Sequence, residues 1–182
     1  VAVDARIVID SAPATARNYA HLAILPYPAR YEQVWPLRGG GVYTIRPIRP
    51  EDAEMEQEFV KRMSDESRYY RFMDTLRELT QTMLVRFTQI DYDREMALVA
   101  TVPGAESKEI QIGVARYVVN PDGESVEFAL AVGDDWQKCG VGRKLMTALI
   151  ECARQKGYRA VVGDVLSTNS KMFRLMTSLG FT

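Results

Sequence analysis

The sequence predicts an α/β domain whose sheet combines antiparallel and parallel strands. Two observations favour this class: three strand-like runs follow one another in residues 95–132, and a helix, a strand and a second helix alternate in residues 142–179. Strands joined by short loops pair antiparallel, whereas a strand reached through a helix can pair parallel. A mixed sheet covered by helices is therefore expected.

The first part of the chain stands apart from this regular pattern. Residues 1–10 alternate like a strand, and residues 11–41 contain four prolines and end in three consecutive glycines. A chain that begins inside a strand indicates a fragment of something longer. We therefore assign residues 1–41 to a remnant strand and a linker, and residues 42–182 to the domain itself.

The domain is expected to begin with a strand in VYTIRPIR, residues 42–49, where apolar and polar side chains alternate. A helix start follows at Pro50, Glu51 and Asp52, because proline suits the first helical turn and acidic side chains stabilise its positive end. Helical spacing continues to about Ile90 and predicts two or three helices.

Three strands are expected next, in EMALVATVP (95–103), IQIGVARYVVN (110–120) and SVEFALAV (125–132). The turn signal Pro121-Asp122-Gly123 separates the last two. Because the loops between them are short, the three strands should form an antiparallel meander.

A helix is expected over residues 142–156, because apolar side chains recur on one face and Gly157 can end it. This face consists of Leu145, Met146, Leu149, Cys152 and Ala153. YRAVVGDVL, residues 158–166, is expected to be a buried strand, and residues 169–179 a last helix. Gly180 then begins an element that the chain does not finish.

Composition narrows the class of protein. Lys and Arg total 23 against 24 Asp and Glu, so no overall charge draws the chain to nucleic acid or to an anionic membrane. The two cysteines lack metal-ligand spacing, which favours a reduced, cytoplasmic protein without a metal. No apolar run is long enough to span a bilayer.

The stretch WQKCGVGRKL, residues 136–145, has features of an anion-binding loop. Gly140 and Gly142 carry no side chains that would keep an anion away from the free N–H groups at the start of the following helix. Positive charge is added by Lys138, Arg143 and Lys144. A phosphate group is the expected ligand.

Two common phosphate loops fit poorly. A Walker loop needs Gly-Lys-Ser/Thr, but Gly142 is followed by Arg-Lys-Leu. A dinucleotide loop needs a third glycine where Leu145 stands and a first glycine directly after its strand, whereas Gly140 comes about eight residues later. Asp164 does stand near the position of the ribose-binding acid of that fold, but the antiparallel meander argues against it.

A third phosphate loop, that of the GCN5-related N-acetyltransferases (GNAT), has the pattern Gln/Arg-x-x-Gly-x-Gly/Ala. Residues 137–142 resemble it at each specified position. With the order of the elements, Asn169 opening the last helix and Leu179-Gly180-Phe181 closing it, the resemblance covers about residues 42–182. It implies the GNAT fold, in which the meander is followed by parallel strands splayed around acyl-CoA, and a last strand that the chain lacks. The acetyl-CoA-binding residues that it implies in this loop are Gln137, Lys138, Cys139, Gly140, Val141, Gly142 and Arg143.

A closer resemblance is carried by NYAHLAILPYP, YTIRPIRPEDAEM, ESRYYRF, VEFALAV and GDVLSTN. These segments resemble the C-terminal acetyltransferase domain of bacterial protein lysine acetyltransferases, which carry an upstream acyl-CoA-synthetase-like, ATP-grasp region. VDARIVID resembles the last strand of that region. The resemblance implies transfer of acetyl from acetyl-CoA to a lysine of a protein, typically an AMP-forming acyl-CoA synthetase. Two alternatives stay open: an enzyme for a small amine or an amino terminus, and a non-catalytic module that senses acetyl-CoA.

Glu127 is the candidate general base. An acceptor lysine, with a reference pKa of about 10.4, must lose a proton before it attacks a thioester. In SVEFALAV, Glu127 shares a face with Ala129 and Ala131, and partial burial beside a substrate cleft would raise its pKa toward a useful value. The lysine acetyltransferases have their base on the same strand, so the resemblance assigns this role to Glu127. Asp164, on the next strand, ranks second.

Further cofactor contacts follow from the resemblance. The backbone expected to pair with the pantetheine arm and to polarise the thioester carbonyl is that of Leu130, Ala131 and Val132. Asn169 and Phe173 are expected to contact CoA, and Asn169 is also a good helix N-cap. Many family members protonate the departing thiolate with a tyrosine one turn before the closing glycine. Met176 stands there, so this acid is missing or is replaced by water.

SRYYRFM, residues 67–73, interleaves arginines with aromatic residues, as a stacking platform for single-stranded nucleic acid would. Tyr69, Phe72 and Met73 share one face of the predicted helix, which favours core packing instead. Arg68 and Arg71 are candidates to flank the acceptor groove.

Overall fold

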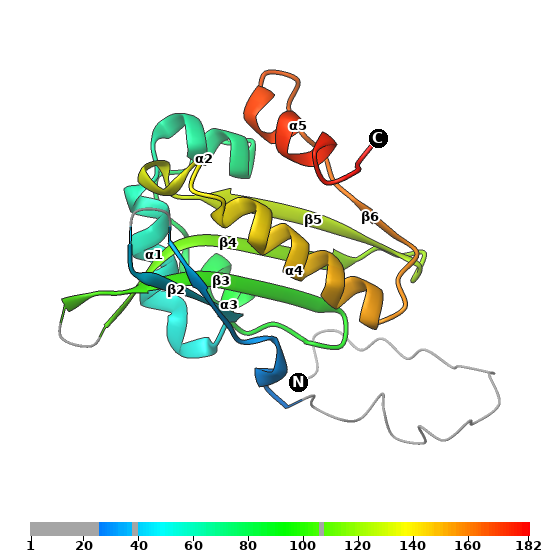
Figure 1. Cartoon of the computed structure of the whole chain (residues 1–182), viewed down its shortest axis with the longest axis horizontal. Coiled ribbons are helices and arrows are strands. Elements are labelled where there is room, and N and C mark those ends of the chain that lie inside the picture. Colours follow the sequence, from blue (N-terminus) through cyan, green and yellow to red (C-terminus); the bar gives the residue numbers. More distant parts are fainter. Residues whose placement is uncertain (1–25, 38–39, 106–107) are drawn as a thin grey trace, which may run out of the picture.

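The computed structural model describes residues 26–37, 40–105 and 108–182, and the strand expected in residues 1–10 lies outside them. The described part contains a six-stranded sheet with the strand order β1-β2-β3-β4-β5-β6 (Figure 1). Neighbouring strands from β1 to β5 pair antiparallel, and β6 pairs parallel to β5. The predicted mixed sheet is confirmed.

The strands are β1 (Gln33–Pro36), β2 (Val42–Pro47), β3 (Glu95–Pro103), β4 (Glu109–Val119), β5 (Ser125–Val132) and β6 (Ala160–Val162). The helices are α1 (Ala53–Arg62), α2 (Asp65–Phe72), α3 (Gln81–Thr88), α4 (Val141–Gln155) and α5 (Ser170–Thr177). Short 3-10 turns are η1 (Ala29–Tyr31), η2 (Pro50–Asp52) and η4 (Asp134–Trp136). The predicted meander is the run from β3 to β5.

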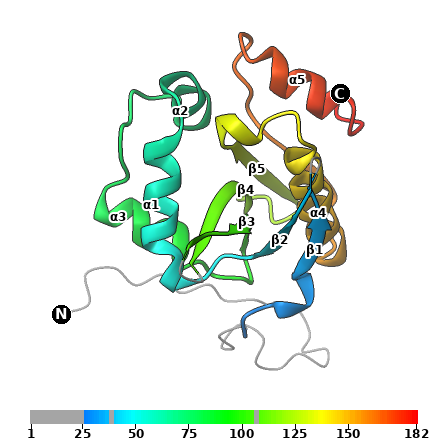
Figure 2. The same cartoon turned by 60° about the vertical axis from the view of Figure 1, so that its left-hand side comes forward.

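Helices cover both faces of the sheet. Figure 2 shows α1, α2 and α3 on one side and α4 on the other. The apolar face predicted for α4 is at most 1% exposed and packs on β strands that contribute Ile45, Leu98, Ile112 and Tyr117. Burial of a large apolar side chain contributes about 1.5–3 kcal/mol to the stability of the fold. The packing of α4 therefore fixes the position of the glycine loop that precedes it.

The edge of the sheet at β6 differs from the prediction. The expected buried strand over residues 158–166 is only three residues long, and Val162 is 43% exposed. The chain diverges from β5 at Gly163, where a Cβ would lie 2.5 Å from the ring of Phe128. The chain leaves the sheet there and continues to α5, which lies past the edge of the sheet formed by β5 (Figure 1).

A strand occurs in the segment that the sequence analysis assigned to the linker. Gln33–Pro36 form β1, which pairs with β2. Trp35 of β1 lies under Lys144 of α4, whose Nζ is 3.4 Å from the ring centroid. Tyr31, just before β1, is 7% exposed and donates a hydrogen bond to Gln155 Oε1 at 3.1 Å. These contacts attach the segment to α4.

The prediction that Tyr69, Phe72 and Met73 form a core-facing side of α2 is partly wrong. Tyr69 and Met73 are 47% and 49% exposed, and only Phe72 packs inward, stacked on Phe87 with ring centroids 6.4 Å apart. Met73 adopts a left-handed conformation with φ of 53° and ends the helix. Its side chain therefore leaves the face that helical spacing assigned to it.

The longest helix among the described residues is α4, with 15 residues. No helix in this part of the chain is both long enough and apolar enough to cross a membrane. In the same part of the chain, no three His, Cys, Asp or Glu side chains are grouped so that they could hold a metal ion.

Candidate active site

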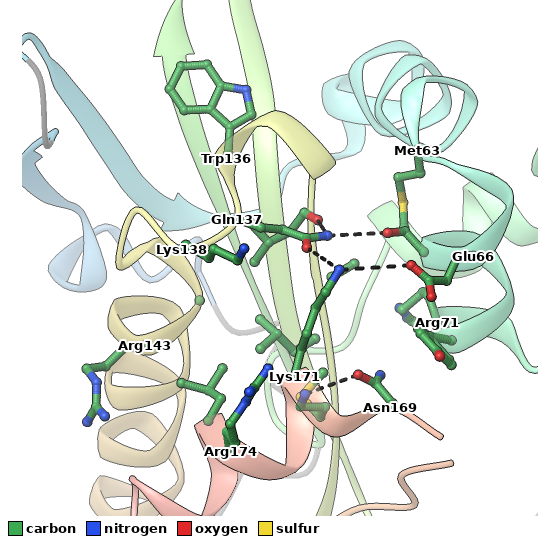
Figure 3. Close-up of a pocket in the computed structure, with 18 of the residues that line it drawn as sticks. Met63, Glu66, Arg71, Trp136, Gln137, Lys138, Arg143, Asn169, Lys171 and Arg174 are labelled. Atoms are coloured by element: carbon green, nitrogen blue, oxygen red, sulfur yellow. Dashed lines mark hydrogen bonds and ion pairs between the residues drawn. The ribbon is translucent and has the colours of Figure 1, made fainter. Parts of the chain in front are cut away.

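A cavity of about 660 Å³ opens between the glycine loop, the end of β5, α2 and α5 (Figure 3). This volume is typical of a cofactor site. The predicted binding residues that line it are Leu130, Ala131, Val132, Gln137, Lys138, Gly140, Gly142, Arg143 and Asn169. The fold therefore brings together side chains from a strand, a loop and two helices, and we call this space the larger cavity.

The glycine loop depends on its two glycines for different reasons. Gly140 has a φ of 89°, a conformation that favours glycine, and it turns the chain into α4. A Cβ on Gly142 would lie 3.3 Å from Val132 Cγ2 and 3.4 Å from Leu175 Cδ2. A side chain at this position would therefore crowd the wall of the cavity.

Free amide groups lie where the loop becomes α4. The first helical hydrogen bond runs from the N–H of Lys144 to the carbonyl of Gly140, at 3.1 Å. The N–H groups of residues 141–143 therefore come before the helical bonding pattern. Together with the positive end of a 15-residue helix, they form a setting that attracts anions.

Cationic side chains surround the same space. Those that line the larger cavity are Lys138, Arg143, Lys171, Arg174 and Arg71. Figure 3 shows Lys171 reaching from α5 to Gln137 Oε1, at 3.2 Å, and to Glu66 Oε2, at 3.9 Å. Because Lys171 and Glu66 are both exposed, this pair is weak. The lysine can be redirected to a bound phosphate at little cost.

The loop is anchored to α2 through two polar residues. Gln137 Nε2 lies 3.3 Å from Ser67 Oγ and 3.4 Å from the carbonyl of Val132. Asp134 accepts hydrogen bonds from the N–H and hydroxyl of Ser64, both at 2.8 Å, and from Ser67 Oγ at 2.7 Å. Burial raises the pKa of Asp134, but these hydrogen bonds outweigh it and hold the pKa below its usual value. Asp134 is therefore a charged acceptor at neutral pH.

The hydrogen bonds of β5 alternate between its two edges. Gly133 N–H donates to the carbonyl of Ile112, and Asn120 N–H donates to the carbonyl of Ser125, both at 2.9 Å. The register between β4 and β5 is unbroken from one of these pairs to the other. Because the backbone groups of successive residues point to opposite edges, the odd-numbered residues of β5 bond to β4.

The even-numbered residues therefore direct their N–H and C=O groups to the opposite edge. For Leu130 and Val132 this edge has no partner strand among the described residues, since β6 pairs only as far as Glu127. Both residues line the larger cavity. Ala131 lines it as well, but its own backbone groups point to β4.

A smaller cavity of about 220 Å³ adjoins the larger one, and its lining includes Glu127, Ala129 and Asp164. Five residues line both spaces, and we call them the shared wall: Tyr70, Arg71, Leu130, Asn169 and Met172. The two cavities therefore meet beside β5, between α2 and the start of α5.

Glu127 lies on the predicted face of β5, but the expected partial burial is wrong. The residue is exposed, and its cross-strand neighbours Val118 and Val162 are 37% and 43% exposed. The core under α1 and α3 reaches Ala131 on this face and does not include Glu127. The carboxylate therefore opens to both the smaller cavity and solvent.

Three predicted cofactor residues line neither cavity. Val141 is fully buried in the core under α4, and Cys139 contacts the carbonyl of Gln137 through its Sγ at 3.6 Å. Phe173 is 45% exposed. Cys139 and Val141 could therefore contact a ligand in the loop only through their backbone groups. The role of Phe173 stays a prediction that this geometry does not support.

Asn169 is 8% exposed, and its Oδ1 accepts a hydrogen bond from Met172 N–H at 3.1 Å. The predicted N-cap is confirmed. Because Asn169 also belongs to the shared wall, capping and contact with a ligand are compatible.

Several lining residues were missed from the sequence. Lys171 and Arg174 stand one helical turn apart directly after Asn169, and this spacing could have revealed them. Tyr70 gave no such signal. Arg71 lines both cavities, as expected of a residue beside the groove, whereas Arg68 bonds the carbonyl of Met63 and the carboxylate of Asp65 instead.

Comparisons with known proteins agree with this arrangement. A family model described as an acetyltransferase (GNAT) domain matches residues 43–182. An acetyltransferase of Pseudomonas aeruginosa is 36% identical over 138 residues, which make up 75% of this chain and 73% of that protein. Acetyltransferase Pat of Mycolicibacterium smegmatis is 32% identical over 166 residues, 91% of this chain but 47% of Pat, so the chain spans about half the length of Pat.

Among solved structures, the GNAT domain of PAT from S. lividans is similar to this chain with a TM-score of 0.79 and 33% sequence identity. The match covers 86% of this chain and 91% of that domain. The similarity therefore extends over most of this chain.

Proposed function

The chain belongs to the GNAT acetyltransferase family and is an acyl-CoA-dependent acyltransferase, and from this premise we propose that it transfers acetyl from acetyl-CoA to a lysine side chain of a protein. The proposed acceptor is an AMP-forming acyl-CoA synthetase, as the resemblance of the sequence to bacterial protein lysine acetyltransferases implies. Similarity to Acetyltransferase Pat and to the GNAT domain of PAT supports acetyl transfer as the reaction.

The observation that carries the proposal is the pair of adjoining cavities, whose linings differ in charge. The larger cavity has free N–H groups and cations where a diphosphate would bind, and the smaller one has the carboxylates of Glu127 and Asp164. The pantetheine arm of CoA would follow the free edge of β5 past Val132 and Leu130. Its acetyl thioester would then lie at the shared wall, within reach of an amine in the smaller cavity.

In the proposed reaction, Glu127 accepts a proton from the lysine ammonium group. The free amine nitrogen attacks the thioester carbonyl carbon directly, and backbone N–H groups at the end of β5 stabilise the oxyanion that forms. When this intermediate collapses, the C–S bond breaks, its electron pair passes to sulfur, and sulfur takes up a proton. The nitrogen loses its second proton to water, and the amide remains on the lysine. Asp164 is the second candidate for the base because it lines the same cavity.

The proposal is tested by incubating the protein with labelled acetyl-CoA and a set of AMP-forming acyl-CoA synthetases, and then mapping the modified residue by mass spectrometry. We expect label on one lysine of a synthetase and loss of synthetase activity in proportion. Transfer to no protein lysine would refute the proposal.

A small amine or an amino terminus is the rival acceptor, because a cavity of about 220 Å³ with two acidic residues would also hold a small cation. Profiling free amines, amino acids and peptides under the same conditions separates the two. A lysine acetyltransferase should prefer an internal lysine of a folded protein over each free amine.

A further inference from the structure

The shared wall marks the place where chemistry on a thioester would occur. This inference rests on the proposed function: acetyl-CoA in the larger cavity and an amine in the smaller one can meet only at the surface that both cavities have in common. The side chains of that surface are therefore those that can act on the leaving thiolate.

Only one residue of the shared wall carries a neutral side chain that readily gives up a proton. Leu130 and Met172 have none, and the amide of Asn169 serves as a helix cap. Arg71 stays protonated in proteins. The phenol of Tyr70 remains, and a phenolic O–H is both a donor and an acid.

The hydroxyl of Tyr70 is held close to the start of α5. It lies 3.3 Å from the carbonyl of Thr168, the residue before Asn169. A hydrogen bond of this length is weak, so the hydroxyl can turn to another acceptor without losing much. Tyr70 therefore bridges α2 and the connection from β6 to α5, across the place where the cavities meet.

Other acids do not compete for this position. Met176 of α5, where many family members have a tyrosine, is 5% exposed and packs in the core under α4. Glu66 in the larger cavity faces Lys171, and the remaining charged residues there are cationic. Glu127 and Asp164 line only the smaller cavity.

Arg71, which also belongs to the shared wall, supplies positive charge there. Its guanidinium stacks on Phe72 and Phe87, 5.0 Å and 5.9 Å from their ring centroids, and has no carboxylate within ion-pair distance among the described residues. The nearby carboxylate of Glu56 pairs with Arg116 instead, at 3.4 Å. Burial, and next the charge of Arg116, lower the pKa of Arg71 to about 10, so the group is still charged at neutral pH. A fixed cation here stabilises a neighbouring anion.

We propose that Tyr70 is the general acid of the reaction and takes the place of the tyrosine that α5 lacks. As the C–S bond of the intermediate breaks, its electron pair passes to sulfur, and sulfur takes the proton from the hydroxyl of Tyr70. CoA leaves as a thiol and Tyr70 becomes a phenolate, which the charge of Arg71 stabilises. The nitrogen loses its second proton to water as the amide forms, and the phenolate regains a proton from water. Glu127 releases to solvent the proton that it took from the ammonium group.

The test compares Tyr70→Phe with Tyr69→Phe, using any acceptor that the wild type acetylates. Tyr69 is the adjacent residue of α2, is exposed and lines neither cavity. Tyr70→Phe should lower kcat about 100-fold without changing the KM for acetyl-CoA, and the fall in kcat at alkaline pH that general-acid catalysis predicts for the wild type should be absent. Tyr69→Phe should behave as the wild type.

Thermal unfolding of both variants controls for the loss of the bond to Thr168, and equal melting temperatures are expected because that bond is weak. Wild-type kcat in Tyr70→Phe, or an unchanged alkaline limb, would overturn the assignment. A higher KM for the acceptor with an unchanged kcat would also overturn it, since this marks a binding role. A wild type that acetylates no acceptor at all would instead contradict the proposed function.

Discussion

Glu127 is the residue on which the proposed chemistry depends most, because its carboxylate opens to the smaller cavity beside the shared wall. Glu127→Gln keeps the shape of the side chain but cannot accept a proton. We expect kcat to fall by about 100-fold or more, while calorimetry gives the wild-type Kd for acetyl-CoA. Asp164→Asn, in the same cavity, is the matched control and should retain most of the rate. The opposite result would exchange the two roles.

Alanine substitutions at two glycines, one at each end of α4, can distinguish the effect of backbone strain from the effect on ligand binding. Gly140 and Gly157 have φ values of 89° and 86°, and a Cβ at either would meet no atom within 4 Å. An alanine at each should lower the free energy of unfolding by a similar amount, about 1–2 kcal/mol. Only Gly140→Ala should also raise the Kd for acetyl-CoA, because only Gly140 lies in the anion-binding loop. Equal Kd values for the two variants would argue against a diphosphate at this loop.

At the scale of elements, Asp134 joins the glycine loop to α2 by accepting hydrogen bonds from Ser64 and Ser67. Its pKa is lowered in the folded protein. The stabilisation is therefore fully present above the unfolded-state pKa of about 3.9 and is lost as the pH falls through the lower folded-state value. Asp134→Asn should melt at a lower temperature than the wild type at pH 7.

This difference should begin to shrink as the pH of the melts falls below about 4, the unfolded-state pKa, and should vanish below the lower folded-state pKa of Asp134, where both proteins carry a neutral side chain at this position. A constant difference between the two proteins from pH 7 to pH 3 would show that the charge of Asp134 does not support the junction.

Elements with a strong local pattern could be predicted from the sequence. The strands β3, β4 and β5 and the helix α4 carry their own periodicity, and α4 buries the face that its spacing predicts. Elements whose structure depends on distant partners could not. The strand β1 is held by β2 and by Lys144, and the exposure of Met73 follows from where α2 ends.

The same distinction between local patterns and distant partners applies to the residues of the candidate site. The glycine loop is a continuous motif, so Gln137, Gly140 and Gly142 could be found from their spacing. Tyr70 comes from α2 and Lys171 from α5, about 70 and 30 residues away from the loop. Only the packing of these helices around the end of β5 brings them to the cavity, and no local pattern records that packing.

At the scale of the whole molecule, the segment before β2 contributes to the fold. A chain that starts at residue 26 keeps Tyr31 and Trp35, whereas a chain that starts at residue 41 loses them and exposes the edge of β2. Loss of a buried aromatic side chain costs about 3–5 kcal/mol. The shorter chain should therefore unfold at lower urea concentration, and equal midpoints would show that β1 is dispensable.

The central claim is that one acetyl-CoA molecule connects the glycine loop to the shared wall, with Glu127 beyond it. A crystal structure of the complex with acetyl-CoA tests this most directly. We expect the diphosphate against the N–H groups of residues 138–143, the pantetheine arm along Leu130 and Val132, and the thioester beside Tyr70. A cofactor bound elsewhere, or a thioester on the opposite face of the sheet from Glu127, would contradict the account.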